Sequence, residues 1–292
     1  MTARALLALF VLPGCGQDDG KPPADDFEFP EPGDWGEGCA DGTRVGSFEV
    51  GHHEIYAAVT GYVQEAIVPT IAEEVGAEGD CVLVRRDNPF CDPACLAGQV
   101  CDLDGTCIPY PAKRSVGVVH VGGVAVPVAA MPDASNDYYA TDVPHDFFLP
   151  GATIQVVAVG DEIEGFALDG AGVPFLQIPG GSWSLAPATP LEVSWTSSDG
   201  PGTILLSFNV DQHGNTPVTM YCEVEDSGTL TVPASLVDQL LSFGRSGVSS
   251  ATIARRTVDA AEIAQGCVEL VVLSRVRVDF VCEGCPCDPG PC

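Results

Sequence analysis

Hydrophobic and polar residues alternate one by one in several segments of the chain. The alternation is clearest over 191–196, 203–210, 218–224 and 268–280, where an apolar residue is followed by a polar one at almost every step. Because successive side chains of a β-strand point to opposite faces, this period of two predicts strands with one buried and one solvated face. Further strands are expected over 115–121, 124–130, 153–159, 173–178 and 250–258.

One segment instead has the spacing of a helix. Its apolar stripe consists of Leu236, Val237, Leu240 and Leu241. Pro233 suits the first helical position and Gly244 suits a C-terminal stop, so a helix is expected from Pro233 to Phe243. Residues 115–281 are therefore expected to form an all-β domain, an antiparallel β-sandwich with one short helix.

Residues 39–90 are expected to form a small β segment that precedes this domain. The stretch Ile55–Val68 fits both a strand and a helix by spacing. Its β-branched and aromatic content, and Pro69 directly after it, favour the strand. Cys81 is expected to close back on Cys39.

Residues 91–109 form a compact cysteine module. Its four cysteines are Cys91, Cys95, Cys101 and Cys107. So short a segment has no core of its own, so we expect disulfides to specify its shape. Four cysteines allow three pairings, and we favour the interleaved one, Cys91–Cys101 with Cys95–Cys107. A zinc site is the alternative.

The remaining cysteines lie near strands and at the end of the chain. Cys222 and Cys267 lie beside two of the strongest strand patterns, so we expect them to pair. Residues 282–292 form a cysteine-rich tail that contains Cys282, Cys285, Cys287 and Cys292. We interpret this tail as a disulfide-linked terminus, with a metal-binding tail as the alternative.

The chain begins with features of an export signal. One basic residue, Arg4, precedes an apolar run over 5–12, which is too short to span a bilayer. The following Leu-Pro-Gly-Cys at 12–15 resembles a bacterial lipobox. The resemblance implies that residues 1–14 are a lipoprotein signal peptide and that the sulfur of Cys15 carries a lipid that anchors the chain in a membrane. The alternative is an ordinary cleaved signal.

Cysteine parity agrees with this reading. Thirteen cysteines is an odd number, and a secreted chain with an odd number would keep a stray thiol. Setting Cys15 aside leaves twelve, enough for six disulfides. These candidates are Cys39, Cys81, Cys91, Cys95, Cys101, Cys107, Cys222, Cys267, Cys282, Cys285, Cys287 and Cys292.

Residues 15–38 are expected to form an acidic, proline-rich tether. Such a composition buries too little apolar surface to offset the entropy of ordering, and like charges extend the chain. The tether would hold the folded part away from the lipid. The alternative is that it packs on the domain around Phe27, Phe29 and Trp35.

The charge balance excludes one class of partner. The chain has 12 Lys+Arg and 41 Asp+Glu, a net charge of −29, so it does not bind nucleic acid by neutralising phosphates. Residues 115–244 contain no Lys or Arg, and five arginines follow: Arg245, Arg255, Arg256, Arg275 and Arg277. They are candidates for docking an acidic partner or a glycan phosphate. Alternatively, they neutralise carboxylates such as Asp259, Glu262 and Glu269.

No catalytic residue is assigned. There is no G-x-S-x-G motif, and His53-Glu54 is not followed by the second histidine of H-E-x-x-H. Asp102–Gly105 resembles the start of a calcium loop, but its twelfth position is Lys113 instead of glutamate. The acidic loops 133–137 and 197–200 remain candidates for calcium. We expect a protein that is not an enzyme and has no resident metal apart from this possible calcium.

The lipobox, the acidic tether, the module at 91–107 and the segment His213–Ala234 resemble secreted, cysteine-rich lipoproteins of myxobacterial type. The resemblance implies no activity. We therefore expect an outer-membrane lipoprotein, facing the periplasm or the surface, with a structural or binding role and an envelope protein or glycan as partner. A calcium- or glycan-binding adhesion module is the alternative.

Overall fold

The computed structural model describes residues 27–180, 182–209, 218–243 and 250–282, which are mostly strand. The element bounds are β1 Arg44–His52, β2 Ala57–Val63, β3 Ile71–Glu78, β4 Cys81–Asp87, β5 Gln99–Cys101, β6 Cys107–Pro109, β7 Val119–Gly122, β8 Val128–Ala130, β9 Asp137–Ala140, β10 Thr153–Ala158, β11 Phe166–Ala171, β12 Ser182–Leu185, β13 Leu191–Ser194, β14 Thr203–Asn209, β15 Val218–Glu225, β16 Thr229–Val232, α1 Ala234–Ser242, β17 Ser250–Ile263 and β18 Gly266–Cys282. The prediction of an all-β fold with one short helix is confirmed.

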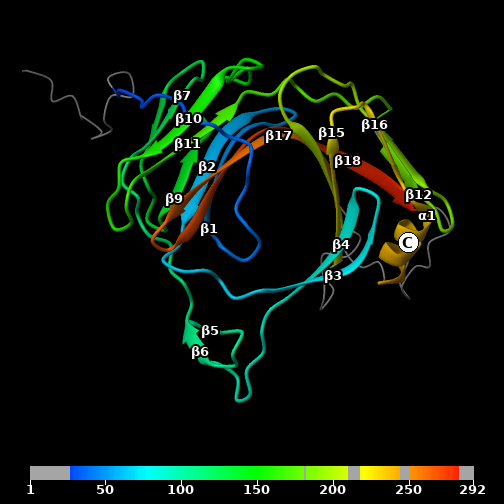
Figure 1. Ribbon diagram of the computed structural model, residues 1–292, viewed down its shortest axis with the longest axis horizontal. Helices are drawn as coiled ribbons and strands as arrows, with labels where there is room; N and C mark the ends of the chain where they lie inside the picture. Colours follow the sequence, from blue (N-terminus) through cyan, green and yellow to red (C-terminus); the bar gives the residue numbers. More distant parts are fainter. Residues whose placement is uncertain (1–26, 181, 210–217, 244–249, 283–292) are drawn as a thin grey trace, which may run out of the picture.

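One ten-stranded sheet organises the molecule. Its strand order is β3-β4-β15-β14-β17-β18-β1-β2-β9, and β12 also pairs with β18. The pairings are antiparallel except those of β18 with β1 and with β12, which are parallel. The β17–β18 hairpin is the longest element and runs across the middle of the sheet (Figure 1).

The first of two cores lies under a separate four-stranded sheet, ordered β11-β10-β7-β8. Phe48, Val59 and Leu270 of the large sheet pack against Ile154 and Leu168 of the small one, and all five are fully buried. These two sheets form a sandwich-like pair at one end of the molecule (Figure 1).

The second core lies at the other end of the same large sheet. Leu83, Leu206 and Met220 from β4, β14 and β15 pack with Trp183 of β12 and Val237 of α1. The β17–β18 hairpin contributes to both cores. Residues 39–90 and 115–281 were predicted as two segments. Strands of both lie in one sheet, so residues 39–90 are not a separate unit.

Local predictions were mostly right, with one clear error. Ile55–Val68 contains strand β2, and α1 lies where the helix was expected, with Pro233 at its N-cap instead of its first turn. The position of Gly244 is outside the described residues. No strand forms over 173–178. Leu176 is buried there, but Pro174 lacks an N–H, so the apolar pattern reflects a buried loop.

Residues 27–38, which we call the strap, contact the domain, so this part of the expected tether is not extended away from it. The Phe27 ring stacks on His120 of β7, with ring centroids 3.8 Å apart. The Gly33 N–H donates to the Asp169 carboxylate of β11 at 2.8 Å. Aromatic side chains within an acidic segment thus find apolar partners on the domain, as the alternative interpretation proposed.

Four disulfides join cysteines within the described residues. Cys91–Cys101 and Cys95–Cys107 are the interleaved pairing that we favoured. The two expected long-range pairs were wrong: Cys39 pairs with Cys267, and Cys81 pairs with Cys222. The reason is topological, because β4 lies directly beside β15 and places Cys81 opposite Cys222. The positions of Cys15 and of residues 283–292 are outside the described residues.

Candidate binding site

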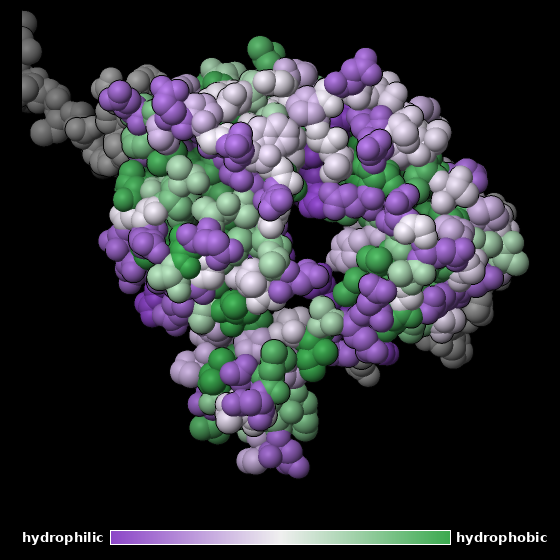
Figure 2. All heavy atoms as spheres, in the orientation of Figure 1, coloured by the Kyte–Doolittle hydropathy of each residue, from purple (hydrophilic) through white to green (hydrophobic). Residues whose placement is uncertain are grey.

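The large sheet curves around a central opening, and the strap and the loop after β2 close the ring (Figure 1). The cavity measures about 850 Å³ and is lined by strands β1, β4, β14, β15, β17 and β18 together with residues 36–42 and 67–70. Figure 2 shows that the opening passes through the molecule and that hydrophilic residues lie along parts of its rim. We call the sheet face that lines it the concave face.

Strand alternation sends the two adjacent arginines of β17 to opposite faces of the sheet. Arg256 lines the opening, whereas Arg255 is buried on the core side. Arg275 and Arg277 of β18 pair with Ala254 and Thr252, which share the face of Arg256 because they lie two and four residues from it. Three of the five predicted docking arginines therefore lie on the concave face.

Two arginines in the opening are paired and a third is not. Arg44 lies 2.8 Å from a Glu269 oxygen, and Arg256 lies 2.9 Å from a Glu223 oxygen. Arg86 lines the same cavity and is exposed, and among the described residues it forms no ion pair. Its guanidinium is thus available to a ligand.

Several of the chain's few basic residues lie on this face. The concave face carries Arg44, Arg86, Arg256, Arg275 and Arg277. These are five of the twelve basic residues in a chain of net charge −29. Asp41, Asp80, Glu223 and Glu269 also line the opening, so the contact available to an anion there is the unpaired guanidinium of Arg86 and not a net positive field.

Arg255 has a structural role, which corrects its prediction as a docking residue. Its side chain is 1% exposed, and its Nε donates to the Asp226 carboxylate at 2.7 Å. Its other nitrogens donate to the carbonyls of Pro174, Phe175 and Thr196. The guanidinium therefore holds two loops against β17, and its counter-charge is none of the three carboxylates that we named from the sequence.

The remaining docking candidates differ from one another. Arg275 forms two hydrogen bonds with the carboxylate of Glu49, at 2.8 and 3.3 Å. Arg277 is exposed and has no ion pair within the described part of the chain. The position of Arg245 is outside the described residues.

One of the two acidic loops proposed for calcium, 133–137, uses its carboxylates internally. Asp133 accepts hydrogen bonds from the backbone N–H groups of Ser135 and Asp137, and the Asp137 carboxylate lies 2.6 Å from Lys113. In the loop 197–200, the backbone N–H of Ser198 donates to Asp226. Calcium binding stays a prediction that these contacts do not favour.

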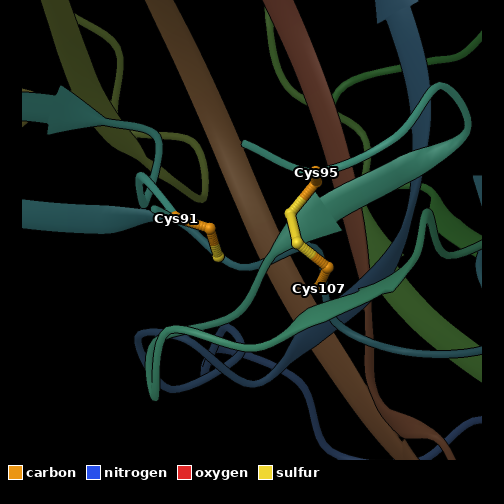
Figure 3. A group of neighbouring side chains, drawn as sticks. All are labelled: Cys91, Cys95 and Cys107. Carbon is orange, nitrogen blue, oxygen red and sulfur yellow. A yellow bond between two sulfur atoms is a disulfide. The ribbon is translucent and has the colours of Figure 1, made fainter. Parts of the chain in front are cut away.

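One group of three possible metal ligands occurs in the described ranges: Cys91, Cys95 and Cys107. Figure 3 shows the sulfurs of Cys95 and Cys107 bonded to each other, while Cys91 has its own disulfide with Cys101. A sulfur in a disulfide is not a thiolate, and zinc requires thiolates. The two disulfides therefore do not favour the zinc alternative for the module.

A buried histidine, His52, lies at the end of β1, and no sequence pattern indicated its burial. His52 is 1% exposed and lies between the rings of Phe148 and Phe175, at centroid distances of 3.8 and 4.4 Å. Burial, and next the nearby His145, lower the pKa of His52 to about 4. The imidazole is therefore neutral at pH 7 and acts as a core aromatic residue.

Sequence reasoning also missed Arg44 and Arg86. Arg86 follows Val82 and Val84 at intervals of two, so its face was readable once residues 81–87 were taken as a strand. The sequence did not indicate that β4 pairs with β15. This pairing places Arg86 in the same opening as Arg256.

The fold and site together define a disulfide-linked all-β protein with an arginine-bearing opening. No family model, characterised protein or solved structure matched the chain in our comparisons. Within the described ranges, none of the helices has the length and hydropathy needed to cross a bilayer.

Proposed function

We propose that the chain is an outer-membrane lipoprotein, anchored through a lipid on Cys15, that binds an anionic glycan of the cell envelope on its concave face. The proposed location rests on the lipobox-like residues 12–15 and on the four disulfides, because disulfides persist in oxidising compartments. Binding is proposed instead of catalysis.

The observation that carries the proposed binding role is the free guanidinium of Arg86 in the opening. A guanidinium offers a planar fork of donors that matches a carboxylate or a phosphate in a bidentate manner. Arg44 and Arg256 line the same cavity and add positive charge, while their partners Glu269 and Glu223 provide acceptors for sugar hydroxyls. Tyr221 in the same wall supplies an aromatic ring. The site thus combines an anion contact, acceptors and an apolar surface.

Replacing Arg86 with glutamine is expected to weaken glycan binding at least tenfold. A charge-assisted hydrogen bond contributes about 1.5–3 kcal/mol, which corresponds to roughly ten- to 150-fold in Kd. The measurement is isothermal titration of the folded protein with hexagalacturonate as the carboxylate probe, dextran phosphate as the phosphate probe and maltohexaose as the neutral probe. The Kd for the preferred anionic probe should also rise with salt.

The matched control is Arg85→Gln on the same strand. Arg85 lies on the opposite face, where it pairs with Glu73 at 2.7 Å, so this variant should bind the glycan like the unmodified protein. Equal losses in the two variants, or no binding of either anionic probe by the unmodified protein, would contradict the proposed role of the opening.

A further inference from the structure

Strand β18 has a short stretch with one unpaired edge. On one side it pairs with β17 along Gly266–Val278. On the other side, β1 pairs with it as far as Ser274, and β12 pairs with it only from Asp279 onward. The residues Arg275–Val278 therefore have no strand on that side, and we call this interruption the notch.

The notch is a real cavity, with a volume of about 480 Å³. Its far wall is the irregular segment 175–178, and His53 and Glu54 lie at one end. That segment is held by other contacts: the Leu176 N–H donates to the Ser274 hydroxyl at 3.0 Å, and the Gln177 carbonyl accepts from Thr196. It thus borders the notch without completing the sheet.

The backbone of the notch can accept another strand. Successive residues of a strand direct their N–H and C=O groups to alternate sides, so about two of the four notch residues face the open side. β1 ends where the gap begins, β12 pairs with β18 beyond the gap, and both strands run parallel to β18. An extended segment of about four residues, roughly 13 Å long, would continue their line.

The side chains around the notch select the chemistry of the occupant. Arg277 lines the cavity and is exposed, with no ion pair among the described residues, whereas Arg275 is already neutralised by Glu49. The exposed carboxylate of Glu54 also lines the cavity, next to His53. Phe175, at 43% exposure, adds aromatic surface to the wall of the cavity. The unpaired guanidinium of Arg277 and the exposed ring of Phe175 favour a segment that places an acidic residue beside Arg277 and an apolar residue beside Phe175.

We propose that the notch binds an extended acidic peptide segment of a partner protein by strand addition to β18. One carboxylate of the peptide pairs with Arg277, an apolar side chain contacts Phe175, and the peptide backbone hydrogen-bonds to the open edge. Main-chain bonds supply affinity and alternate side chains supply specificity in this mode of recognition. None of the residues that line the notch lines the cavity of the opening, although Arg275 and Arg277 lie on the same sheet face. The two proposals are therefore tested with different probes and different variants.

The test uses the folded chain and a fluorescein-labelled hexapeptide of alternating glutamate and valine, followed by anisotropy. Arg277→Glu is expected to weaken binding at least tenfold, because it replaces attraction by repulsion at the peptide carboxylate. Arg85→Glu makes the same change of charge away from the notch and should bind like the unmodified protein. A lysine–valine peptide should not bind.

Two further measurements separate strand addition from simple charge attraction. The glutamate–valine peptide, but not its N-methylated form, should bind and slow hydrogen exchange of the amides in 275–278. Binding of the N-methylated peptide with unchanged affinity, unchanged exchange in 275–278, or no binding of the parent peptide at 1 mM would each overturn the proposal. The glycan titration is read independently, because its probe and its variant are different.

Discussion

Replacing Arg255 with methionine is expected to lower the free energy of unfolding by about 3–5 kcal/mol. Removing one partner of a buried ion pair leaves the other charge uncompensated, and the Asp226 side chain is only 6% exposed. The same change removes the donors to three backbone carbonyls. The loss should appear as a lower urea midpoint with an unchanged slope.

The control for this variant is Arg277→Met. Arg277 is exposed and forms no ion pair in the described part of the chain, so its loss should change the free energy of unfolding by about 0.5 kcal/mol or less. A second change, Asp226→Leu, added to the Arg255 variant should recover part of the lost stability, because it removes the stranded charge. A loss below about 1 kcal/mol in the Arg255 variant would mean that the ion pair is not a main support of the loops.

Replacing both Cys39 and Cys267 with serine is expected to cost about 4–5 kcal/mol. This disulfide joins residues 228 positions apart, and a crosslink that closes a longer loop restricts the unfolded chain more. It also fixes the end of the strap to β18, next to the hydrogen bond from the Cys39 N–H to Glu269. Thermal unfolding of the oxidised variant and of the parent protein measures the difference.

The comparison is the double serine variant of Cys91 and Cys101, whose disulfide closes a separation of only 10 residues. Strands β5 and β6 pair only with each other, so the module is not part of the large sheet. The main unfolding transition should therefore stay within about 1 °C of the parent. Equal shifts in the two variants would show that the long crosslink has no special role.

The strands that were predicted well are those in which apolar and polar residues alternate along the strand itself. In β14 and in the first half of β15, alternate residues are buried, so the period of two was sufficient to find them. The parallel pairing of β1 with β18 joins residues more than two hundred positions apart. No local pattern encodes such a pairing, and for that reason residues 39–90 were treated as a separate segment.

The same limit explains which parts of the site were predicted. The sequence showed that the C-terminal region is rich in arginine. The prediction that five arginines form one patch was wrong, because strand alternation places Arg255 and Arg256 on opposite faces of the sheet. Arg86 joins the opening only through the pairing of β4 with β15. The interleaved cysteine module was predictable because so short a loop allows few pairings, whereas Cys39–Cys267 and Cys81–Cys222 depend on the whole topology.

The central claim is that one cysteine carries lipid while the others are oxidised outside the cytoplasm. Intact mass spectrometry of the protein isolated from its native membrane, after alkylation without reduction, tests it most directly. We expect a chain that begins at Cys15, carries the mass of a diacylglycerol and an acyl group, and takes up no alkylating reagent. An unlipidated chain, or one with several alkylated thiols, would contradict the account.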